Sequence, residues 1–196
     1  MKKKLALAAV VAALGASPGA ASAQDVLSGI TGLACEAILC LSSSVQPAAC
    51  APSLAYYFGL TAKKLVDTIS KRQNFLQLCP VASQTPEMQS LVSAIANGAG
   101  RCDVQSLNTT LFTPADGNSN AYGYIDNQMP GYCGVYIHHI YTDLNSTAPR
   151  YVGTPERGGY WVEAQNYDSA LVAYNERIQR EDEEKNRYQA ESQNGS

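Results

Sequence analysis

Two adjacent histidines, one glutamate in an apolar segment and six cysteines are the residues of this sequence that could carry chemistry. His138 and His139 could bind a metal ion or act as general bases. Adjacent residues on a strand point to opposite faces, so the two cannot act together there. No HExxH motif is present, and no GxSxG motif occurs after the first 23 residues. We therefore expect a structural or surface role for both histidines and predict no metal and no cofactor.

Glu36 is the lone charge in the apolar run 34–43. A buried carboxyl group with a raised pKa can serve as a general acid, which would suit a secreted peptidoglycan hydrolase. Such an enzyme also needs a second carboxylate and a sugar-binding cleft. A surface position or a salt bridge to Lys63, Lys64 or Arg72 is the more common situation. We therefore predict no catalytic residue and keep the hydrolase as an alternative function.

The first 23 residues have the three parts of a bacterial secretory signal peptide: lysines at 2–4, an apolar stretch over 5–14, and small residues at 21–23. We expect cleavage after Ala23. The apolar stretch is too short to cross a bilayer of about 30 Å, and no later segment is long and apolar enough to span one. The sequence therefore predicts a periplasmic chain that has no membrane span once the signal peptide is removed.

The charge of the exported part limits its partners. Removing residues 1–23 takes away three of the 14 Lys and Arg and none of the 17 Asp and Glu, which leaves a net charge near −6. Nucleic acids and anionic lipids call for a basic face. We therefore expect no nucleic-acid partner and consider a protein partner instead.

All six cysteines follow the predicted cleavage site, and an even number in an exported chain indicates disulfide bonds. The repeated close pairs of a zinc site are absent. Cys35 and Cys40 would lie about 7.5 Å apart along one helix, too far to bond to each other, so each needs a partner elsewhere. Six cysteines allow 15 pairings. We predict Cys35–Cys79, Cys40–Cys50 and Cys102–Cys133.

Helix signals dominate residues 24–112, which we expect to form a disulfide-stapled helical core. Thr85 and Pro86 are typical of a helix start, and Met88, Leu91, Val92 and Ile95 would form one apolar face of that helix. Thr61 would cap the longest helix of this region. The predicted helices span 36–41, 52–59, 62–79 and 86–98.

The later part of the chain has a different composition. Residues 113–165 form a tyrosine-rich region, in which we predict a long loop over 113–131, a strand over 132–141 and a hairpin over 150–164. Tyrosine and tryptophan suit protein interfaces, although the same rings could line a small β-subdomain. The candidate interface residues are Tyr136, Tyr160 and Trp161.

Residues 166–196 are predicted to form a C-terminal helix and polar tail. Tyr167, Leu171, Tyr174 and Ile178 follow helical spacing and would give the helix one apolar seam, and beyond Arg180 the sequence is mostly polar. The whole chain therefore predicts a mainly α fold with a small β-hairpin element, built on a disulfide-stapled helical core and a long C-terminal helix.

The segment from Cys35 to Pro80 carries a family resemblance. "CEAILC", then "AACAPSLAYYF", then "KRQNFLQLCP" resemble the TrbM/KikA family of conjugal-transfer proteins. The matching features are the paired cysteines, the third cysteine before a Pro-Ser-Leu-Ala helix with an aromatic pair, and the fourth in the terminal Leu-Cys-Pro. The resemblance implies a cysteine framework, and it implies no catalytic residues.

The resemblance also implies an exported protein encoded with mating-pair-formation genes, located in the donor periplasm near a type IV secretion apparatus. We expect an accessory of conjugation that acts through contacts with a protein of that apparatus and is not an enzyme. Two other functions remain open from the sequence: the secreted peptidoglycan hydrolase, and a disulfide-rich effector or inhibitor released into the medium.

Overall fold

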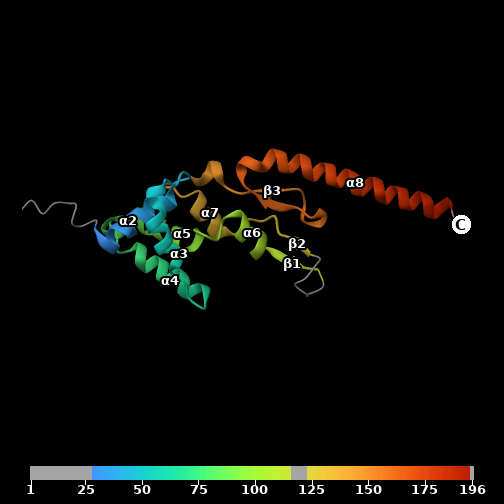
Figure 1. Cartoon of the computed structure of the whole chain (residues 1–196). Helices are drawn as coiled ribbons and strands as arrows, with labels where there is room; N and C mark the ends of the chain where they lie inside the picture. Colours follow the sequence, from blue (N-terminus) through green and yellow to red (C-terminus); the bar gives the residue numbers. More distant parts are fainter. Residues whose placement is uncertain (1–27, 116–122, 195–196) are drawn as a thin grey trace, which may run out of the picture.

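The computed structural model describes residues 28–115 and 123–194, so the predicted cleavage site after Ala23 lies outside the described residues. The fold is mainly helical, as predicted, with short antiparallel strand pairs and a long C-terminal helix (Figure 1). In chain order, the elements of the described part are α2 (Gly29–Ser42), η1 (Ala48–Cys50), α3 (Ala51–Gly59), α4 (Leu65–Leu76), η2 (Pro80–Ser83), α5 (Pro86–Gly98), α6 (Val104–Thr110), β1 (Phe112–Pro114), β2 (Gly123–Ile125), α7 (Gly131–Ile137), η3 (Leu144–Thr147), β3 (Arg150–Val152), η4 (Pro155–Arg157), β4 (Tyr160–Val162), η5 (Ala164–Asn166) and α8 (Tyr167–Asn194).

The helix α2 is the centre of the helical core and contacts α3, α4 and α5. Its sequence is apolar on several sides, and Ala34, Ala37, Ile38 and Leu41 are all buried. These four residues have the i, i+3, i+4, i+7 spacing of one helical face, and Leu39, on another side of α2, is 72% exposed. Figure 1 shows these helices gathered at one end of the molecule, with α8 leading away at the other.

The helix α5 confirms the clearest helix prediction. It begins at Pro86 and ends at Gly98, and the Thr85 hydroxyl accepts a hydrogen bond from the Met88 amide at 3.2 Å. This bond satisfies one of the free amides of the first turn. The predicted apolar face is buried, except that Met88 is only partly covered.

The predicted helix over 62–79 is too long at both ends, because α4 begins at Leu65 and ends at Leu76. Thr61 does not cap it. The hydroxyl of Thr68 accepts a hydrogen bond from the Ala62 amide at 2.8 Å, which holds the preceding residues in a loop. Cys79 follows α4 in a turn and is nearly fully buried.

The strand predicted over 132–141 is wrong, because Gly131–Ile137 forms the helix α7. Cys133, Tyr136 and Ile137 are buried, which is the i, i+3, i+4 spacing of one helical face packed on α5. Burial against α5 therefore overrides the β propensity of the aromatic and β-branched residues in this segment. The histidines lie at and after the end of this helix.

The segment 113–131, predicted as a loop, contains strands. β1 pairs antiparallel with β2, with Phe112 opposite Ile125 and Thr113 opposite Tyr124. The residues between them, 116–122, lie outside the described part. Both strands are only three residues long, too short for their alternation to be visible in the sequence.

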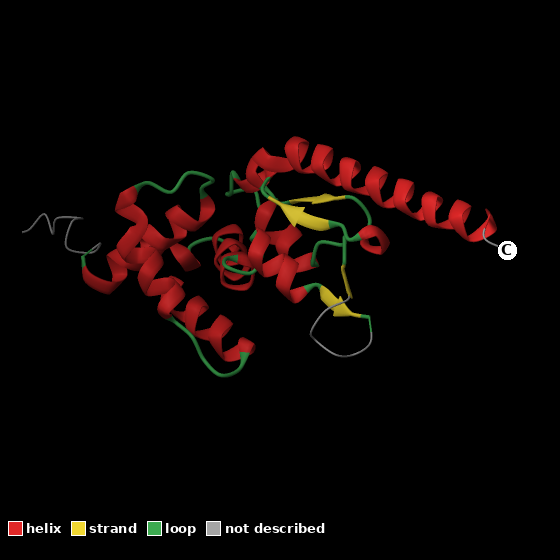
Figure 2. Ribbon diagram, turned by 45° about the vertical axis from the view of Figure 1, so that its right-hand side comes forward, coloured by secondary structure: helices red, strands yellow, loops and turns green. Residues whose placement is uncertain are grey.

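The predicted hairpin is confirmed: β3 and β4 pair antiparallel, with Tyr151 opposite Trp161, and the chain turns through η4 (Figure 2). The first half of α8 packs on this hairpin, and its predicted apolar seam joins Val152 and Val162 in a second small hydrophobic cluster. The polar tail continues α8 as far as Asn194, and all residues from 179 to 193 are exposed.

Candidate functional site

The two histidines line one cavity of about 430 Å³ together with Glu87, and they differ in exposure. His138 is exposed, while His139 is half-buried and packs its ring 5.8 Å from that of Tyr141. Its Nδ1 accepts a hydrogen bond from the Tyr141 amide at 3.2 Å, and burial lowers the pKa of His139. Among residues 28–115 and 123–194, no three His, Cys, Asp or Glu side chains lie close enough together to hold a metal ion.

Glu36 is half-buried on α2, and its carboxylate forms no hydrogen bond or ion pair with another described residue. Of the two situations expected for Glu36, the salt bridge to Lys63, Lys64 or Arg72 is not found among the described residues. The Arg72 guanidinium instead donates to the Ala99 carbonyl at 3.3 Å and lies 4.9 Å from the centre of the Tyr57 ring. Burial raises the pKa of Tyr57 to about 12, although the nearby Arg72 charge opposes that rise.

The cysteines are joined in the same three pairs that the sequence predicted: Cys35–Cys79, Cys40–Cys50 and Cys102–Cys133. The first two bonds hold α2 from two sides, one to the end of the α4 region and one to η1. The third joins the turn after α5 to α7. No free cysteine is found in the described part of the chain, so the thiol chemistry of a catalytic cysteine is not offered there.

The three candidate interface rings are placed differently from one another. Tyr136 and Trp161 are 7% and 4% exposed, so they line the interior and present little surface to a partner. The Tyr136 hydroxyl donates to the Leu41 carbonyl, and the Trp161 indole donates to the Asp126 carbonyl at 3.0 Å. Trp161 is therefore a core residue and not an interface residue. Tyr136 is also buried, with its hydroxyl bonded inside the chain, but it lines a cavity of about 440 Å³ together with Phe58 and Leu144. Tyr160 is half-buried.

A cleft lies between the helical core and the hairpin region. Two adjoining cavities of about 440 and 540 Å³ share Ser44, Thr147 and Glu163, and we call them together the junction cleft. Its walls come from the ends of α2, α5 and α7, from η3 and from the residues after β4. The lining also includes Phe58, Gly100, Asp103, Leu144 and Arg150.

The wall formed by η3 is fixed to the end of α2. The Asp143 carboxylate accepts a hydrogen bond from the Ser44 amide, and the Asp143 amide donates to the Ser42 carbonyl at 3.0 Å. These bonds join residues about 100 positions apart in the sequence. The junction cleft is therefore a feature of the tertiary fold, and its volume falls in the range of ligand sites, roughly 300–1,000 Å³.

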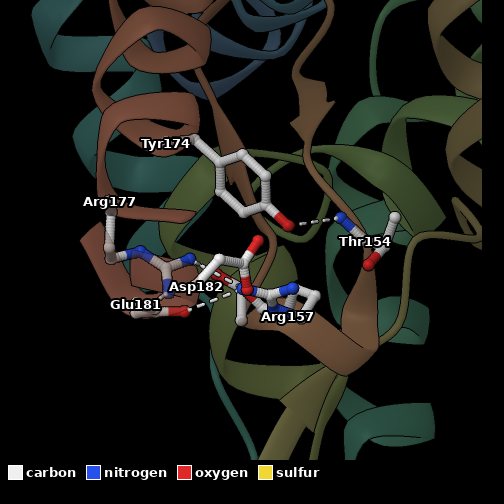
Figure 3. A network of polar contacts seen from close by, with 7 residues as sticks. Thr154, Arg157, Tyr174, Arg177, Glu181 and Asp182 are labelled. Atoms are coloured by element: carbon white, nitrogen blue, oxygen red, sulfur yellow. Dashed lines mark hydrogen bonds and ion pairs between the residues drawn. The ribbon is translucent and has the colours of Figure 1, made fainter. Parts of the chain in front are cut away.

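A second polar arrangement fixes α8 to the hairpin turn, and we call it the α8 latch (Figure 3). Arg157 of the turn donates to Asp182 at 2.8 Å and to Glu181 at 3.4 Å. Arg177 donates to Glu181 at 2.6 Å and to the Arg157 carbonyl at 2.7 Å. The hydrogen bond from Arg177 lowers the pKa of Glu181.

The sequence contained no signal for the junction cleft. Its lining residues come from segments as far apart as Ser44 and Glu163, and none belongs to a local motif. The sequence did not predict the α8 latch either, because Arg157 lies in a turn and Glu181 in a polar run that indicated only solvent exposure. Only the tertiary packing of α8 on the hairpin brings them together.

No helix among residues 28–115 and 123–194 combines the length and apolarity that a bilayer crossing requires. No curated protein and no solved structure matches the chain significantly. A family model does match, that of TrbM, over residues 26–175. This range extends well beyond the Cys35–Pro80 segment and includes the whole helical core, the hairpin and the first part of α8. The chain therefore belongs to the TrbM family of conjugation-associated proteins.

Proposed function

We propose that this protein is a periplasmic accessory of plasmid conjugation that supports the type IV secretion apparatus through protein contacts and without catalysis. The observation that carries the proposal is a TrbM-family chain whose core is held by three disulfide bonds. Disulfide bonds form and persist in oxidising compartments such as the bacterial periplasm. The signal-like residues 1–23 point to the same compartment.

The placement of the side chains supports contact rather than chemistry. The residues that could have carried a reaction are dispersed: Glu36 lies on α2, and His138 and His139 lie at the end of α7. The surface offers binding features instead, namely the junction cleft and an exposed polar helix that projects from the hairpin. A fold of this kind is suited to hold or assemble another protein.

The test is plasmid transfer frequency from donors that lack the gene. Donors are complemented with the full chain or with a matched chain that lacks residues 2–23. We expect transfer to fall without the gene, to recover with the full chain, and to stay low with the shortened chain. Cell fractionation and thiol alkylation of the same strains would check that the full chain is periplasmic and oxidised.

Unchanged transfer in the deletion strain would contradict the proposal. Clearing of a peptidoglycan gel that is abolished by Glu36→Gln would then favour the hydrolase. Recovery of the protein mainly from the culture medium would favour the released effector or inhibitor. Equal rescue by the chain lacking residues 2–23 would contradict the periplasmic part of the proposal alone.

A further inference from the structure

We propose that the junction cleft binds an extended segment of a partner protein that inserts a lysine or arginine side chain next to an apolar one. The inference rests on the proposed function, since it names the surface and the chemistry by which the chain would meet its partner. It comes from the combination of an exposed aromatic ring with two carboxylates, Asp103 and Glu163, in the lining of one cavity.

The apolar part of the junction cleft is formed by the Phe58 ring, which its neighbours hold in place. The Phe58 ring is 39% exposed and lines the first cavity together with Leu144. It is held from behind by Gly100, where a Cβ atom would come within 2.7 Å of ring atom Cε1, and by an edge-on contact with Tyr57 at 5.1 Å. The aliphatic stem of a lysine or arginine packs well on such a surface.

The charged part of the first cavity is acidic. Asp103 and Glu163 line it, and no lysine, arginine or histidine among the described residues does so. Asp103 caps α6 by accepting hydrogen bonds from the Ser106 amide at 2.9 Å and its hydroxyl at 2.8 Å, and each carboxylate oxygen keeps a further lone pair. Glu163 is exposed, and its carboxylate has no hydrogen bond or ion pair with another described residue. Two carboxylates over an apolar floor favour a cationic side chain.

Two arginines lie near enough to oppose this charge. Arg150 lines the adjoining cavity, where its guanidinium stacks 3.3 Å from the centre of the Tyr167 ring. Arg72 lies 5.5 Å from the centre of the Phe58 ring but is buried and does not line the cleft. Glu163 is shared by both cavities, so Arg150 lines the second cavity beside one carboxylate, and Asp103 lines only the first cavity.

The shape and charge of the chain favour a protein segment as the occupant. The first cavity, about 440 Å³, has room for one or two side chains, and the second continues from it across Ser44 and Thr147. An extended backbone could follow this path while one side chain enters the first cavity. The net charge of the chain, −3 overall and near −6 without residues 1–23, would also attract a basic partner.

The test uses the oxidised protein purified from the periplasm and two peptides, acetyl-Ala-Leu-Lys-Leu-Ala-amide and the same peptide with Glu in place of Lys. Binding is followed by amide chemical shifts in NMR spectra of the ¹⁵N-labelled protein. The test variant is Asp103→Asn with Glu163→Gln. Asparagine is as good a helix cap as aspartate, so the variant loses charge and keeps the cap. Glu183→Gln with Glu184→Gln, on the exposed part of α8, is the control with the same change in net charge.

We expect the lysine peptide to shift amides around Ser44, Gly100 and Thr147, and the glutamate peptide to leave them unchanged. The Asp103/Glu163 variant should bind the lysine peptide about fivefold or more weakly, since each exposed charge contact contributes a factor of this order. Its binding should also lose most of the dependence on salt. No shift with the lysine peptide, equal shifts with both peptides, or equal binding by variant and control would each overturn the proposal.

Plasmid transfer separates this inference from the proposed function. If transfer is lost in the gene deletion and the Asp103/Glu163 variant restores it fully, the cleft inference is overturned and the proposed function stands. Unchanged transfer in the deletion would overturn the proposed function, and the peptide titration would still decide whether the cleft binds a basic segment. Rescue by the Glu183/Glu184 control and not by the Asp103/Glu163 variant is the result expected if both are correct.

Discussion

The side-chain amide of Asn108 pairs with both backbone polar groups of Trp161. Its Oδ1 accepts a hydrogen bond from the Trp161 amide at 2.8 Å, and its Nδ2 donates to the Trp161 carbonyl at 2.9 Å. The helix α6 thereby gives β4 the two hydrogen bonds that a neighbouring strand would give. This pairing attaches the hairpin to the helical part of the molecule at a point where no strand is available.

Replacing Asn108 by aspartate should destabilise the protein. The change keeps the shape of the side chain but removes the Nδ2 donor and places a carboxylate beside the Trp161 carbonyl. We expect the free energy of unfolding to fall by about 1–3 kcal/mol, measured by urea unfolding with the fluorescence of the single tryptophan. Thr109→Ala is the control, because Thr109 is exposed and bonds only within its own helix. An equal loss in both variants would refute the special role of Asn108.

The contact between α5 and α7 requires a glycine at position 98. A Cβ atom there would lie 2.5 Å from the Cβ of Tyr136, which is closer than two carbon atoms can approach. We expect Gly98→Ala to lower the free energy of unfolding by about 1–3 kcal/mol through overpacking. Gly59 also ends a helix, but nothing lies within 4 Å of its Cβ position. Gly59→Ala should therefore gain about 0.5–1 kcal/mol, and a gain in both variants would contradict the steric argument.

The three disulfide bonds should contribute unequally, because they close loops of different lengths. Cys35–Cys79 spans 44 residues and Cys40–Cys50 spans 10. Loop-closure entropy then predicts a loss of about 4 kcal/mol when the first pair is replaced by serines and about 2.7 kcal/mol for the second. Steady-state periplasmic levels and urea unfolding would measure both losses. Normal levels and normal mating in the Cys35–Cys79 double-serine variant would contradict a structural role for that bond.

The helical part of the fold could be predicted because its signals are local. Thr85 and Pro86 begin α5 and Gly98 ends it, and the inward spacing of the apolar residues between them depends only on the helical period. The cysteine pairing was fixed only in part by the sequence, since helical geometry excludes Cys35–Cys40 and leaves 12 of the 15 pairings open. For α5 the information lies within a short segment of sequence, whereas Cys35–Cys79 and Cys102–Cys133 join residues 44 and 31 positions apart.

What could not be predicted depends on contacts between distant segments. The residues of α7 have high β propensity, and only the surface of α5 selects the helix that buries Tyr136 and Ile137. The junction cleft has the same origin, because Glu163 and Ser44 become neighbours only when η3 is bonded to the end of α2. The number of tyrosines indicated an interface, but two of the three candidate residues, Tyr136 and Trp161, are buried inside the protein.

The outer half of α8 should be dispensable for folding. Residues 179–193 are all exposed, and the family match ends at residue 175. A chain that stops after Asp182 keeps the α8 latch and should unfold within about 0.5 kcal/mol of the full chain. A chain that stops after Ser169 loses Tyr174, which fills the space beside Gly153, and should unfold at clearly lower urea. Equal loss in both truncated chains would show that the exposed half stabilises the fold.

The α8 latch should weaken in acid because of Glu181. The hydrogen bond from Arg177 lowers the pKa of Glu181 below its ordinary value of 4.5, so the unfolded chain takes up the proton more readily than the folded one. The stabilisation is then present above pH 4.5 and is lost as the pH falls through the lower folded pKa. We expect exchange of the Thr154 amide, which donates to the Tyr174 hydroxyl at 3.2 Å, to become less protected in this range.

The variants Glu181→Gln and Glu183→Gln separate the latch from a general acid effect. Glutamine at 181 keeps a hydrogen-bond acceptor but cannot titrate. In this variant, protection of the Thr154 amide at neutral pH should be lower than in the unaltered protein, and it should change less as the pH falls. Glu183 is exposed and forms no ion pair with another described residue, so its replacement should leave the pH profile as it was. The same profile in all three proteins would mean that Glu181 does not hold α8 to the hairpin turn, and that the apolar seam around Tyr174 does so together with the Arg157–Asp182 contact and the bond from Arg177 to the Arg157 carbonyl.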